Sequence, residues 1–437
     1  MRAQLTVFAL GAVLAVPVMR SAQQPRRMGC DEKNAGLTLP PGFCAGVYAR
    51  GLSGVRHMVV APNGDLFVIE NPARVRPAQP GQPAPPARGI YRLRDFNGNG
   101  RADSVTRVAD GTGSGLFLAN GHLYSEAGNC SLSKCAIVRY ELKTNSSDLT
   151  GKVDTLVVNV PGPAGHTSRE MVVRGSDLFV NVGSASNVCD APDAKPGAPS
   201  ADPCPELPTR AGIWKFSAVA RGQDFSSGQR FVTGLRNGPS LTLNPKDNEM
   251  YVVQHGRDNV NIGLGRDSVF NAENPGEEFF HIVANADYGW PYCFYSMEAK
   301  KKLTNPEYGG DGKKDDRCRD KAQPIYAFPG HWAPDGLLFY TGSQFPAEYK
   351  DGAFVAFHGS WNRAPLPQAG FNVTFLPFKD GKATGAHRVF ADGFYDNRPA
   401  PGASHRPVGL AQGADGSIFV SDDAGGLIYK IVYTGRK

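Results

Sequence analysis

A strand–turn–strand pattern recurs six times along the chain. Each copy holds a short apolar strand, a turn built on Gly, Asn or Asp, and a second strand that ends in small or polar residues. The copies span residues 55–70, 115–128, 168–183, 237–256, 333–359 and 405–423. A further strand precedes each copy and another follows most of them, so that a unit supplies four strands. Six such units predict an all-β fold, a six-bladed β-propeller.

The two ends of the repeat predict how the propeller closes. The last unit ends in the apolar stretch IYKIVY, which needs a strand beside it. Residues 47–52, ahead of the first copy, can supply that strand by pairing into the last blade. Such pairing would remove the free sheet edges of an open array.

The first 22 residues have the features of a secretory signal peptide. Arg2 is followed by an apolar run over residues 5–19 and then by the small residues Ser21 and Ala22. Residues 23–437 then form a single propeller domain, in which no stretch is long and apolar enough to span a bilayer. We therefore expect a secreted or periplasmic protein without a membrane span.

The eight cysteines suit an oxidising compartment. Their number is even and none lies in a CxxC motif, so disulfides are expected. Spacing does not fix the connectivity. Proximity in the sequence suggests the pairs Cys30 with Cys44, Cys130 with Cys135, Cys189 with Cys204 and Cys293 with Cys318.

Arginine and histidine gather in the loops of one face. In an up-and-down blade, the loop that enters the innermost strand and the loop that leaves the second strand share a face. Candidate ligand contacts in these loops include Arg56, His166, Arg236, Asn237, Trp361, Arg363 and Arg406. Trp361 either stacks on the ligand or fills the mouth of the propeller. A ring of Arg and His without a matching ring of Asp and Glu predicts an anionic ligand held by charge-assisted hydrogen bonds.

Several motifs in these loops carry a family resemblance. They are GHTSREMVVRGSDLFVNVGSASN (165–187), GLRN (234–237), QHGRDN (254–259), ADYGWP (286–291), HGSWNR (358–363) and RPVGLAQGADGSIFVSDD (406–423). In this order, over nearly the whole mature chain, they resemble the soluble glucose and sorbosone dehydrogenases that depend on pyrroloquinoline quinone (PQQ). The resemblance implies a PQQ on the propeller axis with a calcium ion beside it.

The resemblance also implies roles for individual residues. His166 matches the general base that removes the substrate hydroxyl proton, a task that suits imidazole. Arg236 and Asn237 match residues beside the reacting carbonyls of the cofactor, where a fixed cation stabilises developing charge. Arg406 matches a residue that binds a cofactor carboxylate.

The resemblance also assigns residues to the calcium ion, and two positions differ from the glucose-oxidising members. Gly256 and Arg257 match residues whose backbone carbonyls bind calcium. Arg363 stands where the family suggests a lysine, and Ser404 stands where the glucose-oxidising members carry a second arginine. The pattern is therefore closer to the sorbosone-type branch.

A second calcium site is suggested by the segment DFNGNGRAD (95–103). Its oxygen side chains, Asp95, Asn97, Asn99 and Asp103, occupy positions one, three, five and nine of a calcium loop. Position twelve is Thr106 instead of the usual Glu. A structural calcium site and an Asx-rich turn between outer strands both fit this pattern.

Together these features predict an exported quinoprotein dehydrogenase. It would oxidise a hydroxyl or hemiacetal of a sugar or polyol by hydride transfer to PQQ and pass the electrons to an external acceptor. Two alternatives stay open: a calcium-centred propeller lactonase, which needs acidic side chains on the axis, and a non-catalytic propeller that binds a glycan or a protein. The net charge of +6 is spread without a basic run, so nucleic acid is not an expected partner.

Overall fold

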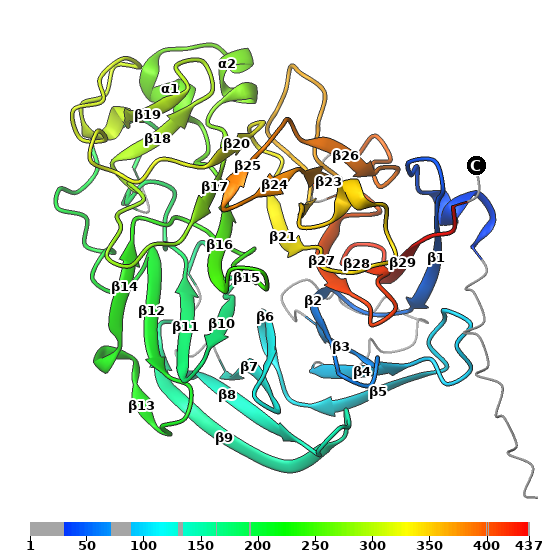
Figure 1. Cartoon of the computed structure of the whole chain (residues 1–437). Helices are drawn as coiled ribbons and strands as arrows, with labels where there is room; N and C mark the ends of the chain where they lie inside the picture. Colours follow the sequence, from blue (N-terminus) through cyan, green and yellow to red (C-terminus); the bar gives the residue numbers. More distant parts are fainter. Residues whose placement is uncertain are drawn as a thin grey trace, which may run out of the picture.

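Six antiparallel sheets surround a central axis as the blades of a propeller (Figure 1). The structure is a computed structural model that describes residues 30–70, 89–129, 134–162, 164–191, 194–398, 400 and 402–435. The predicted six-bladed β-propeller is confirmed. The predicted signal peptide lies outside the described residues.

Each blade holds four main strands, numbered here from the axis outward. Blade 1 has β2 (Val55–Val60), β3 (Leu66–Glu70), β4 (Ile90–Arg94) and β5 (Ser104–Ala109). Blade 2 has β6 (Thr112–Ala119), β7 (His122–Asn129), β8 (Lys134–Leu142) and β9 (Leu149–Val160). Blade 3 has β10 (Met171–Arg174), β11 (Asp177–Val182), β12 (Gly212–Ser217) and β14 (Gln229–Thr233). Blade 4 has β15 (Thr242–Asn244), β16 (Glu249–Gln254), β17 (Glu277–His281) and β20 (Tyr326–Phe328).

The last two blades complete the ring. Blade 5 has β21 (Pro334–Phe339), β22 (Ala353–Phe357), β23 (Asn372–Leu376) and β26 (Arg388–Ala391). Blade 6 has β27 (Pro407–Gln412), β28 (Ile418–Asp422), β29 (Leu427–Tyr433) and β1 (Phe43–Arg50). Outside the blades lie a small hairpin, β24 (Phe378–Lys379) with β25 (Lys382–Ala383), and the 3₁₀ helices η1 (Glu32–Gly36), η4 (Phe225–Ser227), η5 (Pro306–Tyr308) and η6 (Ala347–Tyr349).

Strand β1 brings the N-terminal part of the described chain into the last blade. It pairs antiparallel with β29, from Phe43 opposite Tyr433 to Arg50 opposite Leu427. The strand begins earlier than the predicted range 47–52. In Figure 1, β1 and β29 lie side by side on the outer side of blade 6.

The hydrophobic core is divided among the interfaces between neighbouring blades. Successive side chains of a strand point to opposite faces, so one strand serves two interfaces. In β11, Leu178 and Val180 pack in the cluster shared with blade 2, whereas Phe179 packs in the cluster shared with blade 4. This double burial explains the continuous apolar runs in the second strands, such as LFVIE in β3.

An insertion in blade 4 gathers at one corner of the molecule (Figure 1). It holds the helices α1 (Val260–Leu264) and α2 (Ser268–Glu273) and a hairpin of β18 (Cys293–Ser296) and β19 (Lys301–Thr304). The sequence predicted an insertion over residues 297–323 only. Helices of 5 and 6 residues are too short to show a helical period, which explains why they were missed.

Three of the predicted disulfides are present. They join Cys30 to Cys44, Cys189 to Cys204 and Cys293 to Cys318. The fourth predicted pair includes Cys130, which lies outside the described residues. No helix within the described part of the chain is long and apolar enough to cross a membrane.

Blade 3 also contributes a short strand to blade 2. Strand β13 (Gln223–Asp224), which follows β12 in the sequence, pairs in parallel with the outer strand β9 at Val157 and Val158. At 12 residues, β9 is the longest strand of the described chain. The outer edge of blade 2 is therefore partly covered by its neighbour.

Candidate active site

A cavity of about 450 Å³ opens where loops of five blades meet. Its volume lies within the range of about 300–1,000 Å³ that is typical of ligand pockets. Its polar lining residues belong to the starts of inner strands and to the loops around them; they are Arg56, His166, Thr167, Ser168, Asn237, His255, Asp335, His358 and Arg406. Five of the predicted site residues, Arg56, His166, Asn237, Trp361 and Arg406, thus share one cavity.

The tautomer of His166 is fixed by Ser184, which follows β11. The ring Nδ1 lies 3.1 Å from the carbonyl oxygen of Ser184 and 2.9 Å from its hydroxyl oxygen. A carbonyl can only accept, and the hydroxyl itself donates to the carbonyl of Ser186 at 2.7 Å. Nδ1 must therefore carry the proton, which leaves the lone pair on Nε2. This is the form in which a histidine acts as a base.

The surroundings of His166 keep its ring neutral. Burial, together with the cationic Arg236 and the nearby His255, lowers the pKa of His166 well below its ordinary value. A cation beside an imidazole opposes a second positive charge, and burial opposes any charge. At neutral pH the ring is therefore neutral, with a proton on Nδ1 and none on Nε2.

A buried acidic network corrects the prediction of a cationic ring without matching carboxylates. Arg56 donates to Asp335 at 2.9 Å and to Asp423 at 3.0 Å, and all three side chains are at most 4% exposed. Asp335 also contacts His255 at 3.0 Å, and Asp423 contacts His358 at 2.8 Å. Arg56 and its neighbours hold the Asp335 pKa well below the ordinary carboxyl range, although burial alone would raise it. Arg56 thus lines the cavity as part of an ion network joining blades 1, 5 and 6.

Arg236 lies outside the residues that line the cavity. Its Nε donates to the carbonyl of Asn187 at 3.1 Å, and its Nη2 bonds the side chains of Asn187 and Asp258 at 2.9 and 3.0 Å. Its Nη1 donates to the carbonyl of Gly256 at 2.8 Å. These four bonds hold the guanidinium in the loop scaffold, from which its charge acts on His166.

Asn237 and Arg406 supply polar groups to the cavity wall. Arg406 is anchored through Nε on the carbonyl of His358 at 2.8 Å. Asn237 is 8% exposed, and its Oδ1 has no hydrogen-bond partner among the described residues. Buried oxygens of this kind normally bind a donor from a ligand or a water. A guanidinium, an amide and an imidazole facing one cavity fit the carboxylates and carbonyls of PQQ.

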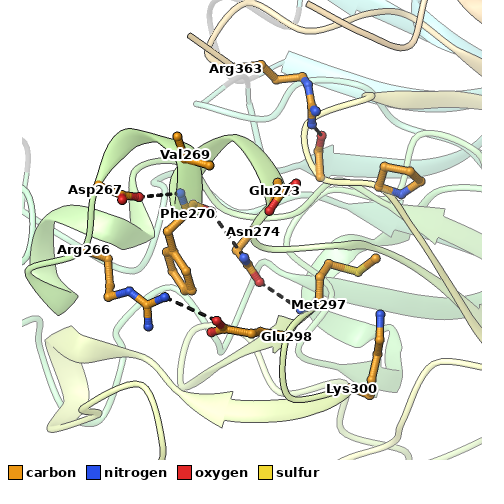
Figure 2. Close-up of a pocket in the computed structure, with 12 residues that line it drawn as sticks. Arg266, Asp267, Val269, Phe270, Glu273, Asn274, Met297, Glu298, Lys300 and Arg363 are labelled. Atoms are coloured by element: carbon orange, nitrogen blue, oxygen red, sulfur yellow. Dashed lines mark hydrogen bonds and ion pairs between the residues drawn. The ribbon is translucent and has the colours of Figure 1, made fainter. Parts of the chain in front are cut away.

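Arg363 is not brought to this cavity. Its Nη1 donates to the carbonyl of Gly330 at 2.8 Å and to that of Ala272. The side chain lines a separate cavity of about 460 Å³ between helix α2 and the turn of the β18–β19 hairpin (Figure 2). In contrast, Trp361 stands at the axial cavity with 57% of its surface exposed.

The predicted calcium site beside the cofactor stays a prediction. The carbonyl oxygen of Gly256 already accepts a hydrogen bond from Arg236, a cation. The side chain of Arg257 turns into the blade 4 insertion, where its Nη1 lies 2.6 Å from a carboxylate oxygen of Glu307. Among the described residues, no group of three or more His, Cys, Asp or Glu could hold a metal ion.

The segment 95–103 forms a turn between β4 and β5, away from the cavity. Asp95 and Asp103 each accept a backbone N–H of the loop at 2.7 Å. The side-chain oxygens of Asn97 and Asn99 accept further backbone N–H groups at 3.0 and 2.8 Å. The geometry is that of an Asx-rich turn, and a calcium ion there stays a prediction.

Sequence reasoning missed two residues that organise the site. Ser184 orients His166, and Asp335 connects three cationic or imidazole side chains. Asp335 did leave a signal, because it is a charged residue within the otherwise apolar inner strand PDGLLF. A carboxylate in such a strand requires buried partners.

The sequence from residue 130 to 434 matches a family model described as TrAA12-like. The chain belongs to this family. The matched range includes every residue of the axial cavity except Arg56. An uncharacterised protein of Borreliella burgdorferi is 31% identical to this TrAA12-like chain over 271 residues, which are 61% of each protein.

Comparisons with PQQ enzymes agree with the predicted resemblance. A pyrroloquinoline quinone-dependent pyranose dehydrogenase of Coprinopsis cinerea is 26% identical over 229 residues, which cover 45% of this chain and 30% of that protein. The chain thus spans less than two thirds of these curated relatives. The holo PQQ domain of the Coprinopsis cinerea pyranose dehydrogenase has the same fold, with a TM-score of 0.70, 22% identity and coverage of 91% of this chain and 97% of that domain. The predicted resemblance to PQQ-dependent sugar dehydrogenases is confirmed at the level of the family.

Proposed function

We propose that this TrAA12-like protein is a PQQ-dependent dehydrogenase that oxidises a hydroxyl or hemiacetal of a sugar or polyol. The observation that carries the proposal is the axial cavity, in which the neutral His166 faces the same space as Arg406 and Asn237. The similarity to a PQQ-dependent pyranose dehydrogenase supports it. A sorbosone-type specificity is part of the proposal and rests on the motif pattern.

His166 is the proton acceptor in this proposal. A substrate hydroxyl that enters the cavity gives its proton to Nε2, because Nδ1 is already protonated and bonded to Ser184. PQQ, when bound, would accept the hydride from the same carbon, so that the substrate loses two electrons and two protons in total. An external acceptor then takes the electrons.

The cofactor would be held by residues of blades 4 and 6. Asn237 offers a buried oxygen and an N–H₂ group, and Arg406 offers a charged guanidinium for a carboxylate. Arg236 is a positioning residue in this proposal, because it does not line the cavity but its charge lowers the pKa of His166. Calcium beside the cofactor is proposed from the family resemblance alone.

Export to the periplasm or the medium is also proposed. The predicted signal peptide and three disulfides among the described cysteines support it. Both point to an oxidising compartment.

The proposal is tested by reconstitution. Purified protein is treated with a chelator, loaded with PQQ with and without calcium, and assayed by dye reduction with a panel of aldoses, ketoaldoses and polyols. We expect PQQ-dependent activity in the wild type and a fall of about 10²–10⁴-fold in His166→Asn, the range for loss of a general base. His122→Asn, in the β6–β7 hairpin, is the matched control and should keep full activity.

Two outcomes separate the alternatives. PQQ binding with no turnover of any substrate would favour a binding propeller, and hydrolysis of lactones without PQQ would favour the lactonase. The lactonase is disfavoured because the carboxylate of Asp335, which lines the cavity, is already ion-paired with Arg56.

A further inference from the structure

The axial cavity has a neighbour that shares one wall with it. This second cavity, of about 260 Å³, lies against the loop after β11 and the loop after β16. Trp361 is the residue that lines both cavities. The second cavity is also lined by Asn187 and Asp258, the two side chains that hold Arg236.

Trp361 is unusual among the tryptophans of the chain. Of the 4 tryptophans, all within the described residues, it alone is exposed, with 57% of its surface open to solvent. Its loop is nevertheless fixed, since Ser360 donates to Gln368 at 2.7 Å and Asn362 donates to Asp258 at 2.9 Å. An anchored loop therefore presents an open aromatic face to both cavities. Such a face is suited to stack on another flat or ring-shaped group.

The second cavity is lined mainly by polar side chains of both donor and acceptor type. Lys195 and Asn259 make no side-chain hydrogen bond to any residue that the structure describes. Asp190 accepts the backbone N–H of Val188 through one oxygen at 3.0 Å. Donors and acceptors in one cavity suit a ligand that carries many hydroxyl groups, whereas a cluster of one charge sign would suit an ion.

We propose that the second cavity is a subsite for a sugar ring, and that the substrates include disaccharides or longer oligosaccharides. One ring of the substrate would lie in the axial cavity with its reacting hydroxyl near His166. The next ring would place its apolar C–H face on Trp361 and its hydroxyl groups toward Asn259, Asp190 and Lys195. This inference rests on the proposed function for the identity of the reaction, but the binding itself does not require PQQ.

A variant that fills only the second cavity tests the subsite. Ala198 lines this cavity and not the axial one, so Ala198→Phe should block the second ring and leave the first alone. In the PQQ-loaded protein we expect kcat/KM for maltose, cellobiose or lactose to fall about tenfold or more through KM, with less than a twofold change for glucose. Equal effects on monosaccharides and disaccharides would overturn the proposal.

A binding measurement gives a readout that is independent of turnover. Maltitol, lactitol and cellobiitol lack the hemiacetal, and their binding to the cofactor-free protein can be followed by calorimetry. Trp361→Ala should weaken this binding about tenfold, whereas Phe96→Ala, which removes another exposed aromatic ring, should not change it. If none of these alditols binds the wild type, the subsite is refuted. If they bind through Trp361 but no sugar is oxidised, the subsite stands and the dehydrogenase proposal fails.

Discussion

The protonation state of a single side chain, His166, sets the pH range in which the proposed reaction can run. The base must be neutral to accept a proton, and its pKa is lowered well below the ordinary value of 6.5. We therefore expect kcat/KM of the PQQ-loaded protein to stay level as the pH falls through 6.5 and to decline only in more acidic buffer. A pH profile between 4 and 8 checks this, and a midpoint at or above 6.5 would contradict it.

Arg236 provides the control for this profile. Its charge lowers the pKa of His166, so its removal in Arg236→Met should raise that pKa and move the acid limb of the profile toward higher pH. If Arg236 had only a structural role, its replacement would reduce activity without changing the pH at which activity declines.

Asp335 is the second residue with a large expected effect. It is 4% exposed and bonds Arg56 and His255, so Asp335→Asn removes one of the two carboxylates that neutralise the buried Arg56 and leaves only Asp423. We expect the free energy of unfolding in urea to fall by about 3–5 kcal/mol, the range for breaking a buried ion pair. Glu348→Gln, which removes an exposed ion pair with Arg388, should cost about 1 kcal/mol or less.

The contribution of Asp335 to the free energy of unfolding should depend on pH in a defined direction. Its pKa is lowered in the folded protein, so the stabilisation is complete above the unfolded-state pKa of about 3.9 and disappears as the pH falls through the lower folded-state value. A wild-type protein that loses stability more steeply than Asp335→Asn in this acid range is the expected result.

At the scale of elements, an ion pair fastens the loop after β16 to the blade 4 insertion. Arg257 and Glu307 are 3% and 2% exposed, and their charged atoms lie 2.6 Å apart. Glu307→Gln should release the tether, which we expect to appear as faster hydrogen–deuterium exchange in residues 255–264 and 302–310 with little change in blade 1. Glu298→Gln, in the same insertion, removes only an exposed contact of 3.4 Å to Arg266 and should exchange like the wild type. Unchanged exchange in Glu307→Gln would show that other contacts hold the loop.

The strands could be predicted from the sequence because their signals are local. A hairpin such as β2–β3 contains its own apolar runs and its own Asn-Gly turn, so its pattern is visible without any distant partner. The short helices α1 and α2 have no such pattern and form against the β18–β19 hairpin.

The site could be predicted only in part, for a physical reason. Each loop revealed its own Arg or His, such as Arg56 and His166, but not the partner of that side chain. The partners of Arg56 are Asp335 and Asp423, which are separated from it by 279 and 367 residues. Likewise, the direction of Arg363 is set by carbonyl groups near α2. Contacts that form only when the ring closes leave no local signal.

At the scale of the whole molecule, the aromatic side chain of Phe43 packs at the junction between β1 and blade 5. The ring of Phe43 lies 4.7 Å from that of Phe345 and 5.0 Å from that of Phe390, measured between centroids. Phe43→Ala should lower the free energy of unfolding by about 3–5 kcal/mol, because it opens a cavity in a cluster that seals the ring. Chemical denaturation followed by tryptophan fluorescence measures the loss. Phe96→Ala, at a ring that is 71% exposed, should change stability by about 0.5 kcal/mol or less, and an equal loss in both would refute the assignment.

The pairing of β13 with β9, the outer strand of blade 2, affects how separate molecules can associate. A rim strand of 12 residues would offer a long template of open amide and carbonyl groups, onto which the rim of another propeller could add. Residues Gln223 and Asp224 occupy that template at Val157 and Val158. A strand of another molecule would have to displace these two residues before it could pair with β9 along its full length. Strand β13 therefore hinders edge-to-edge association of propellers at this strand.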